Sequence, residues 1–142
     1  MNEGLKTLIR LQNWKIDQKR REQGVLEGQR AGYLQLINSL DAEVEREMQL
    51  ASNMATPPDF GTYTQRVKAQ KEELFEKIRD VDAEIEIIAD ALRDLFQELK
   101  RYEISLESRE RTAIEDEKRK EQLELDEISM KMHSRKKAGH II

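Results

Sequence analysis

Nonpolar residues recur at alternating steps of three and four along the second half of the chain. This spacing puts them on one face of a helix and is typical of a coiled-coil seam. Nine consecutive positions follow it: Ile78, Val81, Ile85, Ile88, Leu92, Leu95, Leu99, Tyr102 and Leu106. Upstream, Phe60, Tyr63, Val67 and Leu74 continue the series, with one extra step of four before Ile78 that locally relaxes a supercoil.

A weaker series with the same spacing runs through the first half of the chain. Polar residues interrupt it at Gln12, Lys19, Gln23, Arg30 and Glu47. Its nonpolar members are Leu5, Ile9, Ile16, Leu26, Tyr33, Ile37, Leu40, Val44, Ala51 and Met54. Two long helices that each bury one narrow face are therefore predicted.

The break between these helices lies at Pro57 and Pro58, because consecutive prolines cannot sit inside a helix. The second helix is expected to start at Asp59 or at Thr62, where Thr62 and Gln65 have the spacing of a capping box. A short turn forces the helices to run antiparallel. We predict an all-α fold, a single long antiparallel coiled-coil hairpin over residues 1–142. Its parts are helix 1 at about 3–54, a turn at about 55–61, helix 2 at about 62–136 and a short flexible tail.

The second helix is longer than its partner. Folding the chain about Pro57 places Leu5 beside the region of Arg109, and no helix breaker follows until Gly139. About 25 residues should therefore overhang, which corresponds to about 35–40 Å of helix. This region is densely charged, and acid-before-base pairs at four-residue spacing support a solvated helix.

Composition narrows the function. The chain is 38% charged and 37% hydrophobic, and its net charge of −4 is mixed along the sequence, which disfavours a general nucleic-acid binder. There is no cysteine, signal-peptide pattern or membrane-length nonpolar run. His133 and His140 lack a matching acidic cluster, and no phosphate-binding loop is evident. We expect a soluble, cytoplasmic, non-enzymatic protein without a cofactor.

Two nonpolar clusters lack a partner within such a hairpin and are candidate protein-contact surfaces. The first lies on the overhang and consists of Leu123, Leu125, Ile128, Met130 and Met132. The second lies near the N-terminus, covers more than one helical face and consists of Leu5, Leu8, Ile9, Leu11, Trp14 and Ile16.

Two further features admit two interpretations each. Gly24, Gly28 and Gly32 are one helical turn apart, and either form a groove that accepts Ile85 and Ile88, which we favour, or a flexible zone. The segment from Ile85 to Phe96 is nonpolar around much of the helix, which indicates self-association or a partner.

A resemblance joins several of these features. A hairpin of this length, the Phe60-Gly61-Thr62-Tyr63 motif after its turn, the segment from Phe96 to Glu103 and the segment from Glu124 to Ile128 together resemble the flagellar export protein FliJ and its relatives in type III secretion. The resemblance spans nearly the whole chain.

The resemblance implies a stalk similar to the gamma subunit of rotary ATPases, located in the cytoplasm next to the inner membrane. Implied partners are the hexameric export ATPase, bound through the end that carries both termini, an export-gate protein and export chaperones. The two clusters above would bind the ATPase. Phe60, Tyr63 and Val67 would contact the gate or a chaperone, whereas Arg66, Gln70 and Lys77 are polar there. Roles in flagellum biogenesis, motility and protein transport would follow.

Two alternatives remain open. A structural coiled-coil tether or adaptor unrelated to export would self-associate through Ile85–Phe96. A nucleic-acid adaptor would use the basic tail of Lys131, Arg135, Lys136 and Lys137, which also suits an ordinary helix C-terminus.

Overall fold

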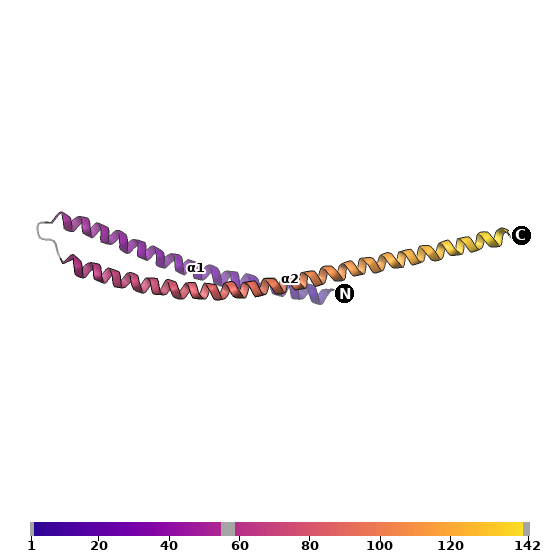
Figure 1. Cartoon of the computed structure of the whole chain (residues 1–142), viewed down its shortest axis with the longest axis horizontal. Helices are drawn as coiled ribbons and strands as arrows, with labels where there is room; N and C mark the ends of the chain where they lie inside the picture. The colour runs from indigo at the N-terminus through magenta and orange to yellow at the C-terminus, as the bar shows by residue number, and fades with distance from the viewer. Residues whose placement is uncertain (1, 55–58, 141–142) are drawn as a thin grey trace. The chain divides into compact units, whose positions relative to one another are not determined.

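The protein is an antiparallel hairpin of two long α-helices, as predicted. The computed structural model describes residues 2–54 and 59–140, with side chains up to Gly139. Helix α1 spans Glu3–Ser52 and helix α2 spans Phe60–His140 (Figure 1). Residues 55–58 of the predicted turn, with both prolines, lie outside the described residues. The chain divides into two compact units, residues 13–97 and residues 1–12 with 98–142.

In the unit of residues 13–97, two ion pairs fix the register of the antiparallel helices. Arg30 Nε lies 2.7 Å from Asp82 Oδ1, and Lys71 Nζ lies 2.6 Å from Asp41 Oδ1. The residue numbers of both pairs have the same sum, so α1 advances one residue as α2 retreats one, without slippage between the pairs. All four side chains remain partly exposed, so the pairs define the alignment more than they stabilise the fold.

The core of this unit is a single line of side chains from the two nonpolar series. Every predicted seam residue of α2 is buried or half-buried. The buried residues are Ile16 and Ile37 from α1 and Val67, Ile78, Val81, Ile88 and Leu92 from α2. Full burial of such a side chain contributes about 1.5–3 kcal/mol, so hydrophobic burial in the seam is the main force that pairs the helices.

The other unit contains the start of α1 and the C-terminal part of α2. Leu99 is buried here, and Gln12 is the one buried polar side chain among the described residues, 3% exposed. Ile9 and Arg10 of α1 line a shallow groove with Leu106 of α2. From Glu107 to Gly139, every side chain of α2 is exposed. This stretch, the overhang, has no second helix beside it (Figure 1).

The helix ends differ slightly from the predicted ones. α1 ends at Ser52, because the N–H groups of Asn53 and Met54 bond to carbonyls three residues back and close the last turn tightly. α2 begins at Phe60 with Asp59 as its N-cap. The carboxylate of Asp59 accepts bonds from the Thr62 hydroxyl at 2.6 Å and the Thr62 N–H at 3.4 Å.

The predicted capping box at Thr62 is therefore wrong, because the Thr62 hydroxyl is bound to Asp59 and lies inside the helix. The hydrogen bonds from Thr62 lower the pKa of the Asp59 carboxyl. At its other end α2 continues through Gly139 to His140, beyond the predicted end at 136. No described glycine has a positive φ, so Gly139 does not terminate the helix.

The glycine groove is also wrong. A Cβ built on Gly24, Gly28 or Gly32 meets no atom within 4 Å, and all three residues are exposed. The reason is the register of α1: here the half-buried seam positions are Leu26, Arg30 and Tyr33, which places the glycines outside the seam.

Gly24→Ala is expected to stabilise the protein by about 0.5–1 kcal/mol, since alanine loses less backbone entropy in a helix and the Cβ enters open space. The matched variant Ala31→Gly, at an exposed position of the same helix, should destabilise by a similar amount. Urea unfolding followed by circular dichroism measures both changes. Destabilisation by Gly24→Ala would mean that the added methyl group meets a contact.

Candidate protein-contact surfaces

The overhang presents its nonpolar residues without any cover. Leu123, Leu125, Ile128, Met130 and Met132 are between 54% and 73% exposed. Isolated exposed nonpolar residues are common on protein surfaces, whereas these are gathered within ten residues of one bare helix. Ion pairs such as Arg111 with Glu107 run along the helix before them. The overhang is thus a charged helix followed by a nonpolar segment.

These five side chains divide between two opposite faces of α2. At about 100° per residue, Leu125, Ile128 and Met132 fall within about 60° of one another. Leu123 and Met130 share a direction about 160–180° away from the centre of that group. The segment therefore offers nonpolar contacts on both sides, with charged residues between them.

The N-terminal cluster divides between covered and exposed residues. In the unit with residues 98–142, Leu5 and Ile9 are half-buried, while Leu8 and Leu11 are 43% and 46% exposed. In the unit of residues 13–97, Ile16 is 2% exposed and belongs to the core. Trp14 is 58% exposed, so its indole is a surface group. Leu8, Leu11 and Trp14 are the members open to a partner.

The candidate gate contacts lie near the end of the hairpin where α2 begins. The rings of Phe60 and Tyr63 are 5.8 Å apart between centroids, and both residues are half-buried. Burial raises the pKa of the Tyr63 hydroxyl, and the nearby Glu43 carboxylate acts in the same direction. Val67 is 5% exposed and packs in the seam, so only Phe60 and Tyr63 have surface to offer. They line a small cavity together with Leu50.

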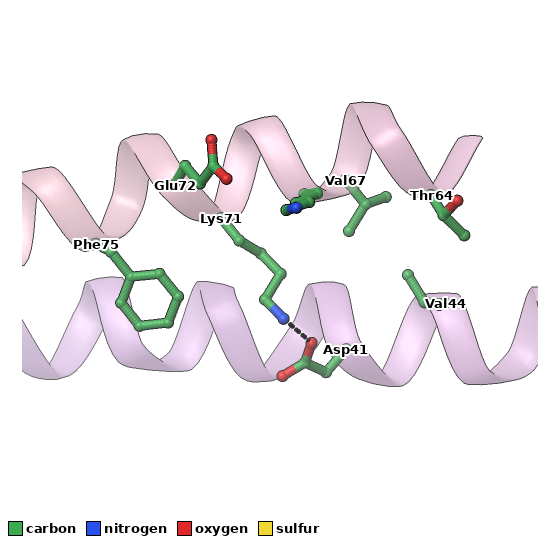
Figure 2. Close-up of a pocket in the computed structure, with 8 residues that line it drawn as sticks. Asp41, Val44, Thr64, Val67, Lys71, Glu72 and Phe75 are labelled. Atoms are coloured by element: carbon green, nitrogen blue, oxygen red, sulfur yellow. Dashed lines mark hydrogen bonds and ion pairs between the residues drawn. The ribbon is translucent and has the colours of Figure 1, made fainter. Parts of the chain in front are cut away.

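A groove on the flank of the hairpin adds no further site. Figure 2 shows Lys71 reaching across it to Asp41, with Val44 and Val67 facing each other beside this ion pair. Phe75 projects toward α1 at one end. Besides this ion pair, the lining includes the polar residues Thr64, Lys68 and Glu72, so the groove is a mixed, open surface.

The segment predicted for self-association is largely covered. Ile85, Ile88, Leu92 and Leu95 are seam residues. Phe96 is 40% exposed, and the guanidinium of Arg20 lies 5.2 Å from its ring centroid, a cation–π contact. Ile87 is the prominent exposed member, at 67%. A dimer that used Ile85–Phe96 would have two exposed large nonpolar residues to bury, Ile87 and Phe96.

The titratable side chains in the described part of the chain form no metal-binding cluster. No group of three or more His, Asp or Glu side chains there has an arrangement that could hold a metal ion. The pKa of Tyr102 is raised because its hydroxyl donates a 2.6 Å hydrogen bond to Glu98, a pair within one turn of α2. Among the same residues, neither helix has a stretch long and nonpolar enough to cross a membrane.

The surfaces described above are exposed nonpolar and aromatic side chains on an all-helical hairpin. No protein-family model, curated protein or solved structure matches the chain.

Proposed function

We propose that the protein is a FliJ-like, non-enzymatic component of a type III export apparatus that binds and activates the hexameric export ATPase. One observation carries the proposal: the overhang is bare on all sides and has nonpolar residues on two opposite faces. A groove on a partner contacts one face of a helix, whereas a ring of subunits surrounds it. Leu123 and Met130 on one face and Leu125, Ile128 and Met132 on the other suit enclosure.

The charge pattern of the overhang supports the same arrangement. Its ion pairs are exposed and local, so each contributes little to stability and costs little to rearrange. Exposed charges of both signs can steer a helix towards a ring opening, while the nonpolar end supplies the affinity. Leu8 and Leu11 would add a contact from α1, and Phe60 and Tyr63 would meet the export gate or a chaperone.

The test combines two measurements with the cognate export ATPase. The protein is expected to stimulate ATP hydrolysis and to co-elute with the ATPase on size-exclusion chromatography. The protein without the ATPase should hydrolyse no ATP. Absence of both stimulation and co-elution would contradict the proposal and would favour a structural tether.

A further inference from the structure

The face of α1 that points away from the seam, between Trp14 and Ala42, has an unusual composition. Steps of four and three define this face, called the outer face below. One of its nine residues, Arg21, is charged, in a chain that is 38% charged. Eight of them are exposed and Gln18 is half-buried. The outer face consists of Trp14, Gln18, Arg21, Val25, Gly28, Gly32, Gln35, Ser39 and Ala42.

The equivalent face of α2 is an ordinary solvated surface. It contains eleven residues in the same unit, and six of them are charged. Its members are Thr62, Arg66, Ala69, Glu73, Glu76, Asp80, Ala83, Ile87, Asp90, Asp94 and Gln97. The lack of charge on the outer face of α1 is therefore a property of that helix and not of exposed positions in general.

Contacts among the described residues do not account for the low charge and the glycines of the outer face. The space above Gly28 and Gly32 is open, and neither glycine has a backbone conformation that requires glycine. Trp14 stands at the end of the same face with its indole 58% exposed. A face that combines an exposed indole, few charges and a closely approachable backbone is suited to another helix packed against it.

The sizes of the side chains indicate which helix. The N-terminal half of the outer face is bulky, with Trp14, Arg21 and Val25. Its C-terminal half is small at Gly32, Ser39 and Ala42, with Gln35 as the one larger residue. A second α1 that runs in the opposite direction puts the bulky half of each copy on the small half of the other.

We propose that two copies of this chain associate through their outer faces, antiparallel and centred on Gly28. Positions 14, 21, 28, 35 and 42 are seven residues apart and pair symmetrically about Gly28 in such a dimer. Trp14 of one copy lies level with Ala42 of the other. Arg21 lies level with Gln35, whose amide oxygen can accept a hydrogen bond from the guanidinium. Val25 lies within one residue of being level with Gly32. Such an interface is isologous, as a two-fold dimer requires.

A parallel pair does not fit this face. It would place Trp14 on Trp14 and Arg21 on Arg21, so that bulk meets bulk and like charges meet. This dimer uses α1, whereas the structural-tether alternative would use Ile85–Phe96 of α2.

Sedimentation velocity over a range of concentrations tests the dimer. The native chain should show a monomer–dimer equilibrium. Ala42→Trp places an indole against Trp14 of the other copy and should raise the dimer dissociation constant at least tenfold. The swap of Trp14→Ala with Ala42→Trp restores a large residue opposite a small one and should restore the dimer. Ala83→Trp, at an exposed position on α2, is the matched control and should leave the equilibrium unchanged.

Cross-linking tests the register independently, since the chain has no cysteine. Gly28→Cys should give a disulfide-linked dimer on mild oxidation, and Ala83→Cys should not. A native chain that stays monomeric overturns the proposal, and this is the result expected if the outer face binds a different protein. A swap variant that stays as weak as Ala42→Trp overturns the antiparallel pairing. Ala42→Trp, Gly28→Cys and the Ala83 variants change no residue of either candidate ATPase-binding cluster, so ATPase binding by these variants is unaffected by loss of the dimer and the two tests are distinguishable.

Discussion

Replacing Leu125, Ile128 and Met132 together with Asp is expected to abolish binding to the export ATPase while the protein keeps its helicity. All three side chains are more than half exposed, so the fold gains nothing from them. If the ATPase buries them, each contributes up to about 1.5–3 kcal/mol to binding. Three unpaired carboxylates in the same site add a desolvation cost, and the sum exceeds what a complex of ordinary affinity can lose.

Co-elution with the ATPase measures binding, and far-UV circular dichroism measures helicity. The matched control adds the same charge to the same helix without removing nonpolar surface: Ser108→Asp, Thr112→Asp and Gln122→Asp. It should keep binding. If it loses binding to the same extent, the contact depends on charge and the nonpolar anchor is wrong.

The opposite face of the overhang distinguishes a ring from a groove. Leu123→Asp with Met130→Asp should also weaken binding when the helix is surrounded. Full binding by this variant would show that a single face is used, and the two-sided enclosure proposed for the overhang would be contradicted.

The fold was predictable because its core is one-dimensional. In a hairpin the buried face has a fixed spacing, so positions such as Val81 and Leu99 can be identified by counting. Burial follows: both are less than 10% exposed. The same counting on α1 was weaker because polar residues occupy seam positions. Gln12 is buried there, whereas Lys19 and Arg30 place their stems over the seam and their charged ends in water.

The wrong predictions, the capping box at Thr62 and the glycine groove, arose where the sequence allows more than one local arrangement. Asp59 and Thr62 are both good N-caps, and the sequence does not show that the Thr62 hydroxyl is used as a donor to Asp59. The glycines of α1 have a regular spacing that suits a groove, but their rotation relative to the seam decides what they face. That rotation depends on the register, which the Arg30–Asp82 pair shows and the sequence leaves open.

The candidate surfaces were predictable as exposed nonpolar residues, because comparing the lengths of the two helices about the turn leaves these residues without partners. Which of them face the same way was not, because it requires the helix to continue without a kink or break through Met132. Within the N-terminal cluster, adjacent residues can differ in burial: Ile9 is half-buried in the seam, whereas Leu8 is exposed. Contact specificity lies in the partner, and no pattern within one chain defines it.

Ile88→Asp is expected to destabilise the hairpin of residues 13–97 by at least about 4 kcal/mol, a large part of the stability of a small domain. Ile88 is 8% exposed in the middle of the seam, so the change removes one of its main nonpolar contacts and puts a carboxylate into a buried position. Ile87→Asp is a matched control one residue away, where the side chain is 67% exposed, and it should change stability by less than about 0.5 kcal/mol.

Thermal unfolding followed by circular dichroism at 222 nm compares the two variants in the same buffer. The cooperative transition should shift far down or vanish for Ile88→Asp and remain native-like for Ile87→Asp. The pair differs only in which face of α2 receives the charge, so the size of the difference measures the dependence of the fold on its single seam. Equal transitions in both variants would mean that the helices are held together by something other than this line of side chains.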